Sequence, residues 1–270
     1  MHRIALGIEY DGSCFRGWQR QAFVSSVQEV VEKALSKVAD HPVVVVCAGR
    51  TDAAVHATAQ VVHFDTIAER SERAWVFGAN TSLAPEVRIL WAKAVSSEFN
   101  ARRSALLRRY RYIIYNYPIR ASLLRGQVSW YYRKLDCQKM SEAAQYWIGE
   151  HDFSSFRAAE CQSKSPIRQM MSIQIQRMND YVVVDLAANA FLHHMVRNMV
   201  GVLLMIGSGQ KPPIWAKEVL FARDRREASI TAPPNGLYLV AVEYPESFGI
   251  PKADEWGLGQ VLVDLKHGAT

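Results

Sequence analysis

The octapeptide Gly49–His56 reads Gly-Arg-Thr-Asp-Ala-Ala-Val-His and places an arginine and a carboxylate two residues apart, between two apolar runs. A carboxylate on a loop that rigid strands hold can be aimed at a substrate, whereas one on a solvated helix face cannot. The alternative is a structural turn, because an Asp in a turn commonly accepts hydrogen bonds from its own backbone. Asp52 is therefore a candidate catalytic residue that needs support from the rest of the chain.

A second group of residues combines positive charge with aromatic rings. On a strand, Tyr110 and Tyr112 share one face, and Arg109 and Arg111 share the other. Such a surface suits RNA, because guanidinium groups bind phosphates and rings stack on unpaired bases. The pattern is equally compatible with tyrosines in a core and arginines in water. The group comprises Arg102, Arg103, Arg108, Arg109, Tyr110, Arg111 and Tyr112.

The segment Phe191–Asn198 opens an apolar helical stripe and carries two histidines and an arginine. Arg197 lies beside the stripe, where its head can reach the rim of a cleft. His193 and His194 are adjacent, so on a helix they point about 100° apart and do not easily share one ion. We therefore predict no metal site. No glycine-rich phosphate loop, G-x-S-x-G motif or deaminase zinc motif occurs, so we predict no cofactor.

The composition is that of an ordinary globular protein with a moderate positive charge. The 32 Lys+Arg against 26 Asp+Glu give a formal charge of +6, which permits a phosphate-rich partner without requiring one. The four cysteines form no C-x-x-C pair, which indicates reduced thiols in a cytoplasmic protein. The longest apolar stretch, Met199–Ile206, is far shorter than the roughly 20 residues of a membrane span, so we predict no membrane association.

Hydrophobic periodicity predicts strands and helices throughout the chain. Ser26 offers a capping box to the first helix, the β-branched run Val43–Cys47 predicts a buried strand, and Asn179-Asp180 predicts a turn between two strands. The predicted strands are residues 4–10, 43–47, 59–65, 87–95, 107–115, 167–178, 181–187 and 237–244. The predicted helices are residues 27–38, 71–79, 140–148, 192–206 and 215–223.

Taken in chain order, the first six predicted elements are β-α-β-β-α-β. The elements that follow them repeat this split βαβ plan. We therefore predict an α+β fold of two ferredoxin-like, RRM-like halves, with antiparallel sheets side by side around a basic catalytic cleft. Residues 1–100 form an N-terminal half that carries the Asp52 loop. Residues 105–245 form a C-terminal half that carries Tyr110 and Arg197, and residues 246–270 form a tail without a domain of its own.

The motifs taken together resemble the TruA family of tRNA pseudouridine synthases from end to end. Each segment alone is a weak signal, but their joint occurrence in this order is highly specific. The segments are Tyr10–Ser13, Phe15–Gln19, Gly49–His56, Phe99–Arg102, Arg109–Tyr112, Asp152–Arg157, Cys161–Ser163 and Phe191–Asn198.

The resemblance implies the pseudouridine synthase fold and a cytoplasmic isomerase that converts uridine to pseudouridine at positions 38, 39 and 40 of the tRNA anticodon stem-loop. It implies a reaction without a cofactor and a homodimer in which one tRNA contacts both subunits. By matching residues, Asp52 is the nucleophile, Arg197 pairs with Asp52, and Tyr110 stacks on the target uracil. Because C5 of the uracil must lose a proton, we also expect Tyr110 to act as the base. Arg50 would fill the space of the flipped-out nucleotide. The implied RNA contacts are Arg50, Arg70, Phe99, Asn100, Ala101, Arg102, Arg103, Glu160, Cys161, Gln162, Ser163 and Lys164.

The chain departs from the family pattern at two positions, with Ala54 where glycine is expected and Arg103 where phenylalanine is expected. A positive φ at Ala54 would cost about 1 kcal/mol and could displace Asp52, whereas a negative φ would be harmless. Our leading hypothesis is an RNA-modifying isomerase. The alternatives are a tRNA-binding or chaperone protein that lost catalysis through Ala54, and an acid-dependent phosphodiesterase, for which the sequence lacks the necessary second carboxylate or metal cluster.

Overall fold

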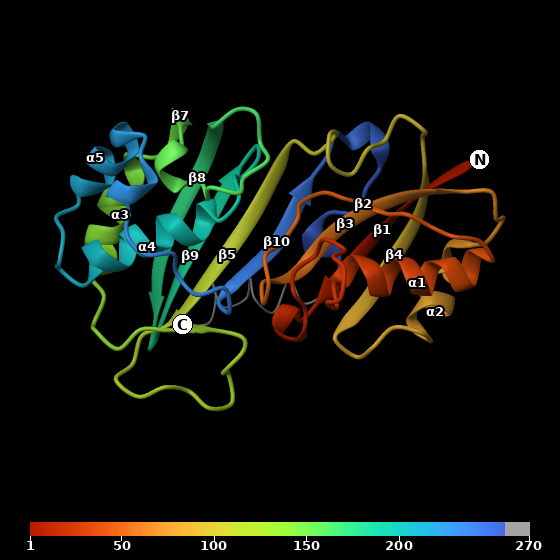
Figure 1. The fold of residues 1–270 in the computed structure, drawn as a ribbon, viewed down its shortest axis with the longest axis horizontal. Helices are drawn as coiled ribbons and strands as arrows, with labels where there is room; N and C mark the ends of the chain where they lie inside the picture. The colour runs from red at the N-terminus through yellow and green to blue at the C-terminus, as the bar shows by residue number, and fades with distance from the viewer. Residues whose placement is uncertain (257–270) are drawn as a thin grey trace. The chain divides into compact units, whose positions relative to one another are not determined.

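The computed structural model describes residues Met1–Trp256, and the chain divides into two compact units. Unit 1 comprises Met1–Leu107 and the chain from Tyr238 onward, and unit 2 comprises Arg108–Leu237. Ten strands and five α-helices occur in the part of the chain that the structure describes (Figure 1), which confirms the predicted α+β class. None of the helices in Met1–Trp256 is long and apolar enough to cross a bilayer.

The sheet of unit 1 contains β1 (His2–Tyr10), β2 (Val46–Cys47), β3 (His56–Thr66), β4 (Val87–Val95) and β10 (Leu237–Glu243). The strand order is β4-β1-β3-β10, with β2 on β3. β1 runs antiparallel to β3 and to β4, and β10 runs parallel to β3. Successive side chains of a strand point to opposite faces, yet every residue from Ile4 to Ile8 is buried, so both faces of this sheet are covered.

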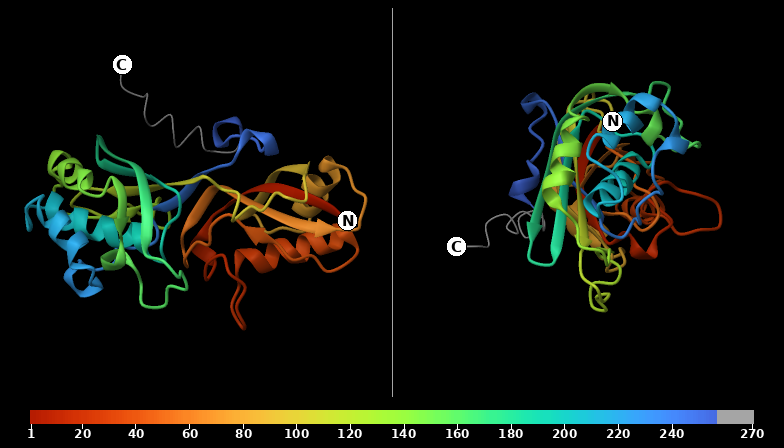
Figure 2. Two further views of the ribbon diagram at one scale, coloured as in Figure 1. Left: turned by 90° about the horizontal axis from the view of Figure 1, so that it is seen from above. Right: turned by 90° about the vertical axis from the view of Figure 1, so that its left-hand side faces the viewer.

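Two helices, α1 (Val27–Ala39) and α2 (Glu72–Asn80), pack together over one face of the sheet (Figure 1). The Ser26 hydroxyl accepts the Glu29 amide at 3.4 Å, so the predicted cap of α1 is present. A segment with two short 3-10 helices, η4 (Glu246–Phe248) and η5 (Ala253–Glu255), lies on the opposite side from α1 (Figure 2). The predicted tail therefore packs on unit 1 as far as Trp256, and residues 257–270 lie outside the described residues.

The sheet of unit 2 contains β5 (Leu107–Tyr115), β6 (Ser129–Trp130), β7 (Gly149–Asp152), β8 (Ile167–Met178) and β9 (Tyr181–Ala188). The strand order is β5-β9-β8-β7, with antiparallel pairing, and the short β6 lies parallel to β5. Asn179 adopts a left-handed φ of +52° between β8 and β9, as the predicted turn requires. The pairing of β5 with β9 brings Tyr110 opposite Leu186.

Three helices, α3 (Cys137–Gln145), α4 (Met195–Gly207) and α5 (Trp215–Ala222), pack against one another in unit 2. α4 begins three residues later than predicted, because His194 has a left-handed φ of +61° and cannot belong to the helix. The remaining short helices are η1 (Gly12–Cys14), η2 (Ser154–Phe156) and η3 (Arg225–Glu227).

The run Val43–Cys47 differs from the predicted buried strand. Only β2 at its end pairs with β3, and Val44 is 68% exposed whereas Val45 is buried. The reason is local, because the Val45 amide donates to the Glu32 carboxylate at 3.0 Å and not to a neighbouring strand. β10 runs parallel to β3, and the division between the two units falls at its start, between Leu237 and Tyr238.

Candidate active site and RNA-contacting loops

The loop Gly49–His56 joins β2 to β3, with Asp52 half-buried and Arg50 exposed. Its backbone turns directly after the carboxylate, where the Val55 amide donates to the Asp52 carbonyl at 3.2 Å. The turn and the candidate catalytic role are therefore compatible, because the turn fixes the backbone from which the Asp52 side chain projects.

A neighbouring segment, Tyr10–Trp18, holds this loop in place. The Trp18 amide donates to the Thr51 carbonyl at 3.0 Å, and the Ala54 amide donates to the Phe15 carbonyl at 3.3 Å. The Tyr10 hydroxyl lies 2.7 Å from Thr51 Oγ1 in a buried contact. Asp52 thus lies between two residues whose backbones are bonded to another part of unit 1.

Two further contacts fix the ends of the loop. A Cβ on Gly12 would lie 2.0 Å from the Val55 carbonyl oxygen, so this close approach requires glycine. The buried Gln60 side chain donates to the Gly49 carbonyl at 2.6 Å. The Tyr10–Ser13 and Gly49–His56 motifs are therefore in direct contact within unit 1.

Ala54 has a φ of +60°, in the left-handed region that favours glycine. This positive φ is the case for which we predict a cost of about 1 kcal/mol in folding stability. The Ala54 and Val55 amides nevertheless both have backbone partners. The strain is therefore accommodated within an intact turn.

Tyr110 lies in β5, is 8% exposed, and meets the Phe191 ring edge-to-face at a centroid distance of 5.0 Å. Arg111 lies on the other face of the strand and is 3% exposed, with bonds of 2.7 and 2.9 Å to the two carboxylate oxygens of Asp185. Arg108 is also buried and donates to the Asn189 carbonyl at 2.7 Å. The sequence interpretation that placed these arginines in water is wrong for Arg108 and Arg111, and their burial also removes them from a surface that could bind phosphate.

Arg197 is held by residues 228–236, here called the strap, a segment that carries no motif in the sequence. Its Nε donates to the Ala232 carbonyl at 2.8 Å, and the Ala232 amide donates back to the Arg197 carbonyl at 3.1 Å. The strap is fixed in turn by buried Asn198, whose Oδ1 accepts from Thr231 at 2.7 Å and from Arg225 at 3.0 Å. These contacts join residues more than 25 positions apart, so no local pattern signals them.

The histidine pair close to Arg197 in the sequence is not helical, in contrast to the prediction. His193 and His194 precede α4, and their ring centroids are 4.0 Å apart. The separation that we inferred from helical geometry therefore does not apply to them.

The segment Phe99–Arg103 is a tight turn in unit 1. The Asn100 carboxamide accepts the amides of Arg102 and Arg103 at 3.1 and 3.0 Å, which leaves both arginine side chains exposed. Phe99 and Ala101 are fully buried, and the Ala101 amide donates to Nδ1 of His63 at 3.1 Å. Three of the five predicted RNA contacts in this segment, Phe99, Asn100 and Ala101, therefore anchor the turn, and the two arginines face solvent.

The segment Glu160–Lys164 is a loop in unit 2. The Arg157 guanidinium donates to the carbonyls of Cys161 and Ser163, both at 2.8 Å, and leaves Glu160, Gln162 and Lys164 exposed. Burial alone raises the pKa of the Cys161 thiol, but hydrogen bonds from the amides of His193 and Ser163, with Arg157 nearby, leave that pKa below its ordinary value.

The last predicted RNA contact, Arg70, is exposed in unit 1. Its Nε donates to the Val38 carbonyl at the end of α1 at 3.2 Å. This bond holds the stem of the side chain against α1. The connection between β3 and α2 is thereby tied to the first helix.

Sequence comparison assigns the chain to a family. Residues 7–102 and 143–245 match the family described as tRNA pseudouridine synthase. The chain belongs to this family. It is 60% identical over 252 residues to tRNA pseudouridine synthase A of Coxiella burnetii (strain RSA 331 / Henzerling II), covering 93% of this chain and 97% of that one. It is 58% identical over 251 residues to tRNA pseudouridine synthase A of Pseudomonas aeruginosa, covering 93% and 88%, and 56% identical over 250 residues to that of Nitrosococcus oceani, covering 93% and 96%.

The family assignment confirms the resemblance on which the sequence interpretation relied, and with it the isomerase class. The matched residues include the Asp52 loop, residues Phe99–Arg102 of the Phe99–Arg103 turn, the Glu160–Lys164 loop and Arg197. Tyr110 falls between the two matched ranges.

Proposed function

We propose that this protein isomerises uridine to pseudouridine at positions 38, 39 and 40 of the tRNA anticodon stem-loop, with Asp52 as the nucleophile. The observation that carries the proposal is the Asp52 loop itself. It is a carboxylate-bearing turn, bonded on both sides of Asp52 to the Tyr10–Trp18 segment, in a chain of the tRNA pseudouridine synthase family. Loops fixed in this way position reactive groups at low entropic cost.

The reaction breaks the C1′–N1 glycosidic bond and forms a C1′–C5 bond, so the uracil must detach, rotate and reattach without leaving the site. The Asp52 carboxylate has three possible roles in this sequence, as the group that attacks C1′, attacks C6 of the base or assists glycal formation. In each of them C5 finally loses a proton, for which Tyr110 is the proposed acceptor. No step needs a cofactor, because the base carries its own electrons to the new bond.

The other assignments follow the physical demands of reaching a stacked base. Arg50 takes the space that the flipped nucleotide vacates, and Tyr110 stacks on the uracil, which together offset an unstacking cost of a few kcal/mol. Arg197 supplies the cation that balances the Asp52 carboxylate. The RNA footprint includes Arg70, the exposed arginines of Phe99–Arg103 and the Glu160–Lys164 loop. We further propose that the enzyme acts in the cytoplasm as a homodimer.

Release of tritium from tRNA labelled at uridine C5 tests the central assignment. We expect the wild type to release tritium to water, and Asp52→Ala to lower the rate by at least about 10³-fold while still binding tRNA. Asp40→Asn is the matched control, because Asp40 is an exposed carboxylate in unit 1 at the end of α1, and it should behave as wild type. A wild type that binds tRNA tightly and releases no tritium would favour the binding or chaperone protein instead.

A further inference from the structure

The hairpin Gln21–Val24 presents an aromatic side chain that the fold does not use. Gln21 and Val24 form an isolated antiparallel bridge, with Ala22 and Phe23 as the turn. Phe23 is 104% exposed and has a φ of +66°. A left-handed backbone is costly for any residue with a Cβ, and exposing a whole phenyl ring gains nothing from burial. Glycine or asparagine would suit the turn better, so Phe23 does not stabilise it.

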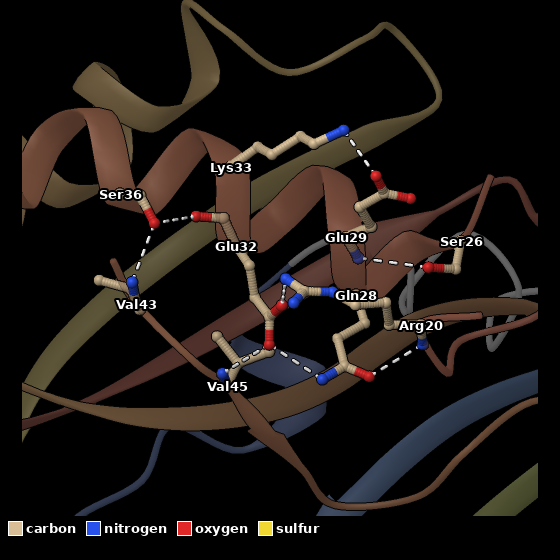
Figure 3. A network of polar contacts seen from close by, with 9 residues as sticks. All are labelled: Arg20, Ser26, Gln28, Glu29, Glu32, Lys33, Ser36, Val43 and Val45. Atoms are coloured by element: carbon tan, nitrogen blue, oxygen red, sulfur yellow. Dashed lines mark hydrogen bonds and ion pairs between the residues drawn. The ribbon is translucent and has the colours of Figure 1, made fainter. Parts of the chain in front are cut away.

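The base of this hairpin is firmly held, as Figure 3 shows. The Arg20 amide donates to Oε1 of Gln28 at 3.1 Å, and the Gln28 side chain donates to Glu32 at 2.9 Å. The Glu32 carboxylate is 1% exposed, forms an ion pair with the Arg20 guanidinium, and accepts the Val45 amide at 3.0 Å. One buried carboxylate thus ties the hairpin to α1 and to the strand that leads into the Asp52 loop.

The hairpin also lies close to the candidate active site along the chain. It begins after Trp18, whose amide donates to the Thr51 carbonyl next to Asp52. Phe23 lies five positions after Trp18, and a chain extends at most about 3.6 Å per residue, so their Cα atoms are within about 18 Å. In Figure 2 this red segment stands out from the body of unit 1. A tRNA held at Asp52 is large enough to reach it.

The charge of the segment fits an anionic partner. Residues 13–28 contain two arginines and no acidic residue; Arg20 forms the ion pair with Glu32, so the exposed Arg16 is the candidate phosphate contact. Guanidinium groups beside an exposed ring are the pattern that binds single-stranded RNA, with phosphates on the cations and a base on the ring. A protein partner would be expected to bury more apolar surface than a single ring.

We propose that Phe23 is a further RNA-binding residue, which stacks on an unpaired base of the tRNA substrate while Arg16 binds a neighbouring phosphate. The proposal rests on the proposed function for the identity of the RNA. It explains why a strained, exposed phenylalanine stands at the tip of a braced hairpin: its favourable contact is made only when RNA is bound.

The test is to compare Phe23→Gly and Phe23→Tyr for thermal stability and for affinity to a full-length tRNA transcript. Phe23→Gly should raise the melting temperature, because it relieves the left-handed strain, and should weaken tRNA binding by about ten-fold. Phe23→Tyr should keep wild-type affinity. These opposite changes in stability and affinity are not expected of a merely structural residue. Phe77→Ala is the control, because Phe77 is an exposed ring on α2 with the Arg73 guanidinium 4.6 Å from its centroid, and its affinity should be unchanged.

A benzophenone amino acid at position 23 identifies the partner directly. We expect ultraviolet crosslinking to the tRNA, and none from the same group at position 77. Unchanged affinity of Phe23→Gly together with no crosslink would overturn the proposal, and a crosslink to a second protein chain would replace the RNA by a protein interface. Failure of the proposed function is a separate result, since it requires that the wild type release no tritium, whatever residue 23 does to binding.

Discussion

Ala54 lies two residues after Asp52, the candidate nucleophile, and has a backbone conformation that alanine disfavours. Its φ of +60° is one that glycine adopts freely and alanine does not. The surrounding bonds, from Ala54 to Phe15 and from Val55 to Asp52, persist despite the strain. The strain is therefore a cost in stability, and we expect the position of Asp52 to be preserved.

Ala54→Gly should stabilise the protein by about 1 kcal/mol and raise its melting temperature by about 2–4 °C, because glycine has no Cβ to clash in this conformation. Thermal unfolding followed by circular dichroism measures the shift, and tritium release measures catalysis. We expect kcat to stay within about two-fold of wild type. A large rise in kcat would show that alanine does displace the nucleophile.

At the scale of elements, the packing of the strap 228–236 on α4 positions Arg197. A Cβ on Gly201 would lie 2.1 Å from the Ile230 carbonyl oxygen, so the strap approaches the helix where a glycine leaves room. Two residues further along, Ala232 exchanges two hydrogen bonds with Arg197. Glycine in a helix interior normally costs stability, so its presence here is explained by this contact.

Gly201→Ala should therefore push the strap away from α4, with a loss of about 1–3 kcal/mol in the free energy of unfolding and a fall in kcat as Arg197 loses its partner. Urea unfolding and tritium release measure the two effects. Gly78→Ala is a matched control in the interior of α2, where the new Cβ would meet only the Val38 side chain, at 3.1 Å. If both variants proved equally stable and active, the strap would not position Arg197.

If the two exposed loops bind RNA, their cations contribute to the salt dependence of tRNA affinity. Arg102 projects from the turn in unit 1 and Lys164 from the Arg157-braced loop in unit 2. Replacing either by alanine should weaken tRNA binding and reduce the slope of log K against log salt by about one. Lys217→Ala on α5 is the control for loss of an exposed lysine and should leave the slope unchanged. A wild-type slope in Arg102→Ala or Lys164→Ala would remove that residue from the footprint.

At the scale of the whole molecule, acid stability depends on a histidine buried in the sheet of unit 1. Burial, with Arg3 nearby, lowers the pKa of His63 from its ordinary 6.5 to about 4. The neutral ring accepts the Ala101 amide and so supports the Phe99–Arg103 turn. As the pH falls below 6.5 the unfolded chain binds a proton that the folded protein excludes, so folding stability falls between pH 6.5 and pH 4 and is constant above 6.5 with respect to this group.

His63→Gln should flatten this dependence, because glutamine can accept the same amide without titrating. We expect the free energy of unfolding of wild type to lose at most about 1.4 kcal/mol per pH unit more than the variant across this window. Urea titrations at pH 4 to 8 make the comparison. Parallel curves for the two proteins would mean that His63 is protonated in the fold at the same pH as in the unfolded chain.

Periodicity, local hydrogen bonds and residue order were enough to predict most of the helices and strands, the capped helix after Ser26, the turn at Asn179 and the family motifs, but not the short strands β6 and β7. The fold was needed to reveal the positive φ of Ala54, the burial of Arg108 and Arg111, the pairing of β10 with β3, and the strap that holds Arg197. Each of these depends on contacts between residues far apart in the chain. A local pattern shows that an arginine lies on one face of a strand, but an Asp185 or an Asn189 must be brought beside it before its role is fixed.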